Sequence, residues 1–230
     1  GFNVVIVGNG LIARAFNNSL YEFNHVIIFA SGVSNSSSTN DADFDRELSL
    51  LKKYQFSKKK LIYFSTSSLF DKACQNSPYI KHKINIEKQI QALFSRYIIY
   101  RLPILVGKSS NPYTLTNYLY NSIKLGKKIE LQVNACRYLI GIDDVVKFVY
   151  QTSSVNNLIV NLNYDNKLNM VNIVAIFEKI IGVKANVVLV DKGDCYTVDN
   201  SLFISFLTKN NIVQQDCCTD VFNIIKKYYV

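Results

Sequence analysis

Apolar runs separated by helix-like segments recur through the first hundred positions. The runs that predict strands cover Asn3–Val7, His25–Ala30, Leu61–Ser65 and Tyr97–Leu102. The segments that predict helices cover Leu11–Leu20, Asp41–Tyr54 (with Asp41 or Asp43 as the cap) and Tyr79–Phe94. Strands that are apolar throughout, rather than at alternate positions, are typical of a parallel sheet covered on both faces. We therefore predict an α/β fold with a Rossmann-like parallel sheet and helices on both faces.

The pattern after Val106 mixes helices and strands less regularly. Predicted helices cover Thr114–Leu125, a segment capped by Asp143 or Asp144 that ends near Thr152, Val171–Ile181 (ended by Gly182) and Val221–Tyr229. Predicted strands cover Lys128–Val133, Arg137–Ile142, Leu158–Leu162 and Ala185–Val190. We predict a Rossmann-like part over residues 1–105 and a mixed substrate lobe over 106–230. The strand at about 158–162 returns to the main sheet.

Composition and charge exclude several classes of protein. The 230 residues carry a formal net charge of +9, but the chain is rich in Lys, Asn and Ile and its lysines are dispersed. Lys58, Lys59 and Lys60 form the only run of three, which a solvated turn explains, so we expect no nucleic-acid partner. No apolar run reaches membrane-spanning length, so we expect no membrane partner.

The cysteines give no metal-binding or disulfide pattern. Their number is odd and none has metal-ligand spacing: Cys74, Cys136, Cys195, Cys217 and Cys218. We therefore expect reduced thiols, a cytoplasmic location and no metal site.

The turn after the first strand is the first candidate for chemistry. Gly8 and Gly10 precede a helix, and the small Ala13 stands three residues further on. A Gly-x-Gly-x-x-Gly/Ala turn places a nucleotide pyrophosphate at a helix N-terminus, because glycine permits the turn and the close backbone approach. An ordinary glycine turn between a strand and a helix has the same pattern, so both interpretations stand at this point.

A second group of residues predicts acid–base chemistry. Tyr79 and Lys83 stand four apart at the start of a predicted helix and so share one face. Thr66 lies at the end of the neighbouring predicted strand. An ammonium group beside a phenol lowers its pKa, and a hydroxyl can orient the reacting oxygen. A solvated helix start would show the same Tyr-x-x-x-Lys spacing; the order of the three motifs favours the catalytic interpretation.

Five blocks, in order, resemble the extended short-chain dehydrogenase/reductase family, which includes sugar-nucleotide epimerases, dehydratases and ketoreductases. They are the Gly8 turn, Phe64–Phe70, Pro78–Lys83 with Glu87, Arg101–Gly107 and Arg137–Val145. The resemblance implies that Tyr79 is the acid/base, that Lys83 partners it and binds the nicotinamide ribose, and that Thr66 orients the carbonyl.

The resemblance also implies binding residues. Those for NAD or NADP would be Gly8, Gly10, Leu11, Ile12, Arg14, Ser31, Lys83 and Pro103. Those for substrate would be Ser67, Ser68 and Arg137, the last at a diphosphate, although a surface charge explains Arg137 equally well. Dehydratases carry Asp and Glu where this chain has Ser67 and Ser68, which argues against dehydration.

The chain departs from the family on the adenosine side. Four strands precede the Arg101 segment where the family has six, so the sheet is expected to be truncated there. Ser31, Gly32 and Val33 follow the second strand, where the family has an acidic residue that binds the adenosine ribose. Arg14 could instead meet a 2′-phosphate, or lie on the helix surface. Because these strands and this acidic residue are missing, we expect weaker binding of the cofactor.

Two functions follow from these observations. The first is an NAD(P)-dependent epimerase or ketoreductase that acts on a nucleotide-activated sugar, in a protein that could form a homodimer as family members often do. The alternative is a non-catalytic nucleotide- or sugar-nucleotide-binding protein with a degenerate cofactor site.

Overall fold

The computed structural model describes residues 3–230, which form two compact units. The first comprises the described residues up to Phe70, Cys74–Leu102 and Ile142–Leu162. The second comprises Asp71–Ala73, Pro103–Gly141 and Asn163–Val230. The helix over Ile142–Gln151 thus joins the first unit with the returning strand, whereas the sequence prediction assigned it to the lobe.

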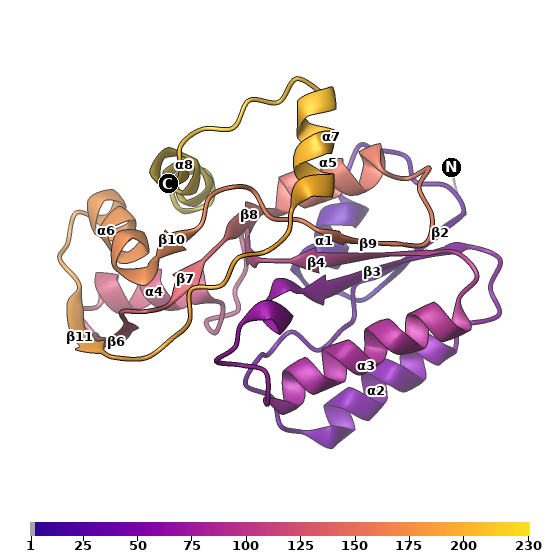
Figure 1. The fold of residues 1–230 in the computed structure, drawn as a ribbon, viewed down its shortest axis with the longest axis horizontal. Coiled ribbons are helices and arrows are strands. Elements are labelled where there is room, and N and C mark those ends of the chain that lie inside the picture. The colour runs from indigo at the N-terminus through magenta and orange to yellow at the C-terminus, as the bar shows by residue number, and fades with distance from the viewer. Residues whose placement is uncertain (1–2) are drawn as a thin grey trace. The chain divides into compact units, whose positions relative to one another are not determined.

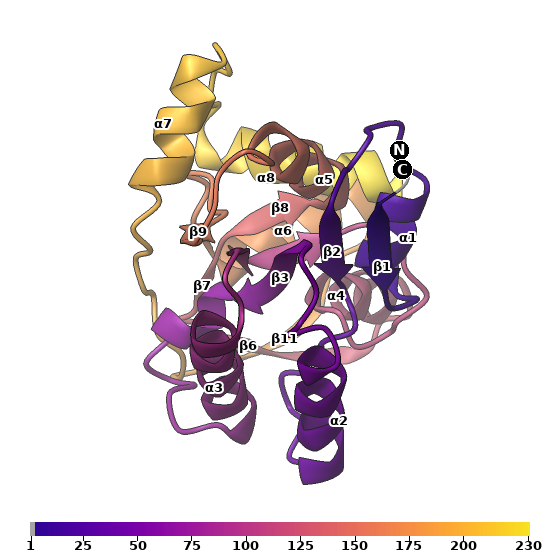
Figure 2. The same cartoon turned by 90° about the vertical axis from the view of Figure 1, so that its right-hand side faces the viewer.

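The first unit is built on a five-stranded parallel sheet in the order β1-β2-β3-β4-β9. The strands are β1 (Val4–Val7), β2 (Val26–Phe29), β3 (Lys60–Thr66), β4 (Tyr97–Leu102) and β9 (Leu158–Asn161). The predicted parallel sheet and the return of the late strand are both confirmed. β1 is an end strand of the sheet, with β2 beside it on one side only (Figure 2).

Helices cover both faces of this sheet, as predicted. They are α1 (Leu11–Asn17), α2 (Asp41–Lys52), α3 (Pro78–Leu93) and α5 (Ile142–Gln151). α2 and α3 cover one face, and α1 and α5 the other (Figure 1). Because both faces are covered, β2 and β3 are buried along their whole length, which explains the apolar runs Val26–Phe29 and Leu61–Phe64.

Two predicted helix caps are wrong. Asn40 caps α2 by accepting a hydrogen bond from the Ala42 N–H, so Asp41 and Asp43 lie in the first turn, where a helix N-terminus favours negative charge. Helix α5 already begins at Ile142, which places Asp143 and Asp144 inside its first turn.

The second unit combines helices with three two-stranded sheets. Its helices are α4 (Leu115–Lys124), α6 (Met170–Ile181), α7 (Ser201–Lys209) and α8 (Cys217–Tyr229). Its strand pairs are β5 (Ile104–Val106) with β8 (Leu139–Gly141), β6 (Lys128–Gln132) with β11 (Asn186–Val190), and β7 (Cys136–Arg137) with β10 (Leu168–Asn169). Its core includes Leu119 of α4, Ile129 of β6, Phe177 of α6 and Ile225 of α8.

The sequence prediction for this unit needs several corrections. The single strand expected over Arg137–Ile142 is divided at Tyr138 into β7 and β8, which pair with different partners. Helix α7 and the short strands β5 and β10 were not predicted. Helix α8 begins at Cys217, earlier than the predicted Val221, because Asp216 caps it with a hydrogen bond from the Thr219 N–H.

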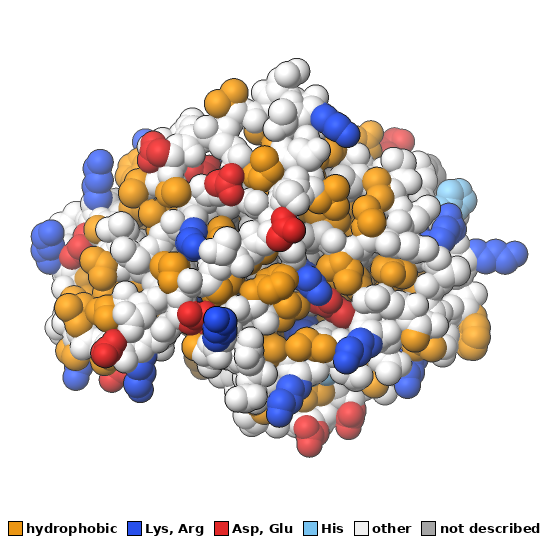
Figure 3. Space-filling model, in the orientation of Figure 1, with side chains coloured by type: hydrophobic (Ala, Val, Ile, Leu, Met, Phe, Trp, Pro, Cys, Tyr) orange, Lys and Arg blue, Asp and Glu red, His pale blue; other side chains and the backbone are white. Residues whose placement is uncertain are grey.

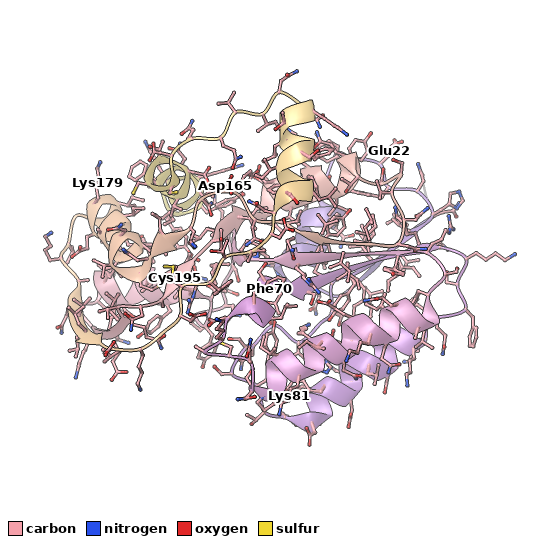
Figure 4. All side chains as sticks on the ribbon, viewed as in Figure 1. Glu22, Phe70, Lys81, Asp165, Lys179 and Cys195 are labelled. Carbon is pink, nitrogen blue, oxygen red and sulfur yellow. A yellow bond between two sulfur atoms is a disulfide. The ribbon has the colours of Figure 1, made fainter. Side chains whose placement is uncertain are left out.

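The expectation of five reduced thiols is wrong for Cys136 and Cys195, which form a disulfide (Figure 4). The bond joins β7 to the segment after β11, across 59 positions, so the spacing of the cysteines could not indicate it. Because disulfides are uncommon in reducing compartments, the thiol argument for a cytoplasmic location no longer stands.

Charged side chains are mixed rather than gathered on the face shown in Figure 3, where blue Lys and Arg alternate with red Asp and Glu. No helix among residues 3–230 has both the length and the apolar character needed to cross a membrane.

Candidate active site

Helix α3 presents the predicted catalytic pair from its first two turns. The Ser77 hydroxyl caps the helix by accepting from the Ile80 N–H (3.1 Å), and Pro78 occupies the first turn, where its missing N–H has no helical partner to lose. This start places Tyr79 at the beginning of the helix and Lys83 one turn further on. Both side chains are buried, at 8% and 2% exposure.

Thr66 meets Tyr79 at the end of β3. Its side chain hydrogen-bonds the Tyr79 hydroxyl, while its Oγ1 also accepts from the Ser68 N–H (3.0 Å). Ser67 is buried in the short 3-10 turn that follows β3, and Ser68 is partly exposed there. The structure therefore brings Thr66, Tyr79 and Lys83 together at the carboxyl edge of the sheet, where ligands of such sheets bind.

A buried carboxylate that the sequence prediction missed lies next to Lys83. Glu47 of α2 is fully buried, and its Oε1 and Oε2 lie 3.2 Å and 3.4 Å from Lys83 Nζ. Lys83 Nζ also donates to the Tyr63 hydroxyl at 2.9 Å, and Tyr63 in turn donates to Glu47. The Val33 N–H (2.8 Å) and His82 Nε2 (2.9 Å) complete the hydrogen bonds to this carboxylate.

These contacts set the charge states of Glu47 and Lys83. Burial alone would raise the pKa of Glu47, but the His82 hydrogen bond, the Lys83 charge and the bonds from Tyr63 and Val33 lower it to about 2. Burial lowers the pKa of Lys83, and the Glu47 carboxylate opposes this shift. Glu47 is thus a carboxylate paired with a buried ammonium.

Tyr79 does not follow the sequence prediction that Lys83 lowers its pKa. Burial raises the pKa of Tyr79, the Glu47 charge raises it further, and only the Thr66 hydrogen bond lowers it. The reason is that Lys83 is paired with Glu47, while its Nζ lies 5.7 Å from the centre of the Tyr79 ring. The phenol is therefore held in its protonated form.

One sequence signal could have identified Glu47. It stands three residues after Phe44 and four before Leu51, on the apolar face of its helix, and both neighbours are buried. A carboxylate on such a face requires a buried partner. Nothing in the sequence indicated which partner, because His82, Lys83 and Tyr63 lie on other elements.

A second buried network fixes α3 against β3 and β4. Glu87 accepts from the Ser65 hydroxyl (2.6 Å) and from Arg101 Nη2 (2.7 Å). The Arg101 guanidinium also lies 5.3 Å from the ring centre of Phe70, which Figure 4 labels just after β3. In the same figure Lys81 lies on the exposed side of α3, away from Phe70. Ser65, Glu87 and Arg101 thus position the helix that carries Tyr79.

The glycine turn after β1 has the geometry that a dinucleotide turn requires. Gly8 has φ +123°, and a Cβ there would lie 2.3 Å from the Ala30 carbonyl oxygen. Gly10 precedes α1 with no atom within 4 Å of an added Cβ, and Leu11 and Ile12 begin the helix. The residues fit the pyrophosphate of a dinucleotide, since the turn is tight and its outer side is open.

The adenosine side of the turn lacks its usual partner. Ser31, after β2, accepts from Arg46 Nη1 through its hydroxyl (3.2 Å) and from Nη2 through its carbonyl (3.1 Å). Arg14 Nη1 donates to the Asn9 carbonyl (3.2 Å). Arg14 therefore contacts the loop after β1, and Arg46 contacts the loop after β2, where no carboxylate follows the strand. These residues do not fit the ribose of NAD through the usual carboxylate.

The remaining predicted residues, Arg137 and Pro103, belong to the second unit. Arg137 lies on β7 and its Nη1 donates to the Cys136 carbonyl (2.8 Å). Pro103 lies between β4 and β5. Their predicted contacts with substrate and cofactor stay predictions.

Comparison with solved structures identifies the fold. A dTDP-4-dehydrorhamnose reductase from Clostridium acetobutylicum matches with a TM-score of 0.76 and 13% identity, over 97% of this chain and 98% of that one. The Bacillus anthracis reductase in complex with NADP matches with a TM-score of 0.73 and 15% identity, over 97% and 98%. A UDP-glucuronic acid 4-epimerase from Bacillus cereus, in complex with UDP-glucuronic acid and NAD, matches with a TM-score of 0.68 and 16% identity. The match covers 96% of this chain and 78% of that one.

The chain thus has the Rossmann fold of NAD(P)-dependent sugar-nucleotide reductases and epimerases, and these structural neighbours are enzymes. No family model matches the sequence, and no curated protein matches it.

Proposed function

We propose that this protein is an NAD(P)-dependent reductase or epimerase that acts on a nucleotide-activated sugar. The observation that carries the proposal is the hydrogen bond between Thr66 and Tyr79 at the carboxyl edge of the sheet, with Lys83 one helical turn away. The fold shared with sugar-nucleotide enzymes supports the substrate class.

The chain's residues would divide the work as follows. Thr66 orients the substrate carbonyl, and Tyr79 donates its phenolic proton to the carbonyl oxygen. The hydride for the carbonyl carbon would come from the nicotinamide of NADH or NADPH. The carbonyl becomes an alcohol, and the Tyr79 phenolate regains a proton from solvent. The glycine turn at Gly8 and Gly10 binds the pyrophosphate.

Binding is the first test. NADH and NADPH are titrated against the protein by fluorescence and by calorimetry. We expect at least one to bind below millimolar concentration; if neither does, the redox function is refuted. Turnover is then measured with UDP- and dTDP-linked 4-keto sugars and with the corresponding alcohols, so that net reduction and inversion of a stereocentre are told apart by product analysis.

Tyr79→Phe tests the assigned role. The variant should bind the dinucleotide as the wild type does and lose at least about a hundredfold in kcat, the usual contribution of a positioned proton donor. Tyr21→Phe is the matched control, because this half-exposed tyrosine precedes β2 at the opposite end of the sheet. Unchanged turnover in Tyr79→Phe would remove Tyr79 from the mechanism.

A second function is favoured by a specific observation. Lys83 donates to Glu47 and Tyr63, and no acid follows β2, so two usual cofactor contacts are engaged elsewhere or absent. A non-catalytic sugar-nucleotide-binding protein would show this pattern. It would bind UDP or dTDP sugars in calorimetry without any dinucleotide and without turnover.

A further inference from the structure

Glu47 has the properties of a built site rather than an incidental ion pair. Its carboxylate is removed from solvent, yet it accepts hydrogen bonds from four different donors. These donors come from the loop after β2, from β3 and from α3. A buried charge that loses its partner is strongly destabilising, so each group in this arrangement is held to its partner.

The loop after β2 leaves room for the ion pair between Glu47 and Lys83. A Cβ on Gly32 would lie 2.9 Å from Lys83 Nζ and 3.0 Å from Glu47 Oε2. Glycine at this position therefore allows the loop after β2 to pass directly over the ion pair. On the other side, the His82 ring stacks on Phe44 at 4.4 Å between centroids, which fixes the ring that bonds Glu47.

Lys83 has all its donors engaged within this cluster. An ammonium group has three N–H bonds, and Nζ contacts both Glu47 oxygens and the Tyr63 hydroxyl. Its positive charge is thus compensated at 3.2 Å, whereas the Tyr79 ring centre is 5.7 Å away. Coulomb attraction falls with distance, so Glu47 dominates the electrostatics of Lys83.

We propose that Glu47 is a positioning residue that neutralises Lys83 and thereby keeps Tyr79 as a proton donor, which suits the site to carbonyl reduction rather than to epimerisation. This inference rests on the proposed function and narrows it. An epimerase must first remove a proton from an alcohol, which needs a phenolate at neutral pH. A reductase needs the protonated phenol that this arrangement maintains.

The other charged and titratable groups near Glu47 and Lys83 do not change the conclusion that Glu47 compensates the charge of Lys83. Arg46, on α2 beside Glu47, lowers the pKa of Lys83, and Glu87, on the same helix as Lys83, raises it. From β3, Tyr63 is held protonated, because burial and Glu47 raise its pKa. His82 of α3 bonds the carboxylate directly. None of these groups places an uncompensated positive charge next to Tyr79.

The first test measures Tyr79 directly in the wild type and needs no cofactor. Tyrosinate absorbance is titrated in the wild type and in Tyr79→Phe, and the difference reports Tyr79. We expect no Tyr79-dependent tyrosinate below about pH 10, the ordinary phenol value. Ionisation of Tyr79 near neutral pH in the wild type would overturn the proposal.

The second test removes the charge of Glu47 and keeps its shape. The tyrosinate titration of Glu47→Gln is compared with that of Glu47→Gln/Tyr79→Phe, and the difference reports Tyr79. We expect the pKa of Tyr79 to be lower in Glu47→Gln than in the wild type by at least about one unit, since the opposing charge is gone. Asp45→Asn, an exposed neighbour on the same helix, is the control and should change nothing. An unshifted Tyr79 in Glu47→Gln refutes the role of Glu47.

A second variant at Glu47 and the pH dependence of turnover complete the test. If Glu47→Gln does not fold, Glu47→Asp withdraws the carboxylate from Lys83 by one methylene, and a smaller shift in the same direction is expected; no shift refutes the proposal. Where turnover is measurable, the alkaline limb of kcat/KM for reduction should move with the tyrosinate titration. Failure of dinucleotide binding refutes the proposed function but leaves the titration result intact, so the two failures are distinguishable.

Discussion

Gly8 lies so close to Ala30 that a single added carbon would meet the Ala30 carbonyl oxygen at 2.3 Å. The Ala30 N–H also donates to the Val7 carbonyl (2.8 Å), so the turn after β1 and the loop after β2 are joined through the backbone. The two loops therefore cannot separate without loss of the sheet's edge. The glycine is a requirement of packing as well as of the turn.

Gly8→Ala should destabilise the first unit. The φ of +123° strains any L side chain, and the Cβ would overlap backbone that cannot move aside, so we expect a loss of at least about 2 kcal/mol. Urea unfolding measures it. Gly10→Ala is the matched control, because nothing lies within 4 Å of its added Cβ. Equal stability of the two variants would contradict this account.

The Glu47 carboxylate should make stability fall in acid. Its pKa is lowered from 4.5 to about 2 on folding, so the unfolded chain binds a proton first, and the contribution of this group is present above about pH 4.5 and lost as the pH falls towards 2. The shift corresponds to about 3 kcal/mol.

Glu47→Gln should therefore be less stable than the wild type at pH 7 and lose less stability between pH 4.5 and pH 2. Urea midpoints at several pH values measure both. Asp45→Asn, exposed on the same helix, should track the wild type throughout. Parallel acid curves for Glu47→Gln and the wild type would show that folding does not lower the pKa of Glu47.

Arg14 and Arg46 lead us to expect a preference for NADPH over NADH. Both guanidiniums stand at the loops after β1 and β2, and a phosphate on the adenosine ribose would meet positive charge there. Arg14→Ala should weaken the binding of NADPH about tenfold, which is about 1.4 kcal/mol, and leave the affinity for NADH unchanged. Calorimetry measures both, with Lys81→Ala on α3 as the control. Equal losses for the two dinucleotides would exclude a 2′-phosphate contact.

Loss of the disulfide should destabilise the second unit. Cys136 and Cys195 enclose 59 positions, and a cross-link over such a loop is worth about 4 kcal/mol through the unfolded chain. Cys195→Ser and a reducing agent should each lower the melting temperature, whereas Cys218→Ser, an exposed thiol, should not. Insensitivity of the wild type to reductant would show that the bond does not support the fold.

The sequence by itself determined the main elements of the first unit. β1 to β4 are visible as largely apolar runs, because helices cover both faces of their sheet, and α2 and α3 are visible from the apolar face that each buries. Thr66, Tyr79 and Lys83 could also be found, since strand ends and helical spacing bring such residues to one edge of the sheet.

Only the tertiary structure decided the chemistry of that set. Glu47 is distant from Lys83 in sequence, and neither spacing nor composition indicates that a carboxylate from α2 neutralises the ammonium. The same limit applied to Cys136 and Cys195, and to the strand division at Tyr138. Local pattern specifies which residues can be buried, whereas the charge of a buried group depends on the partners that long-range packing brings to it.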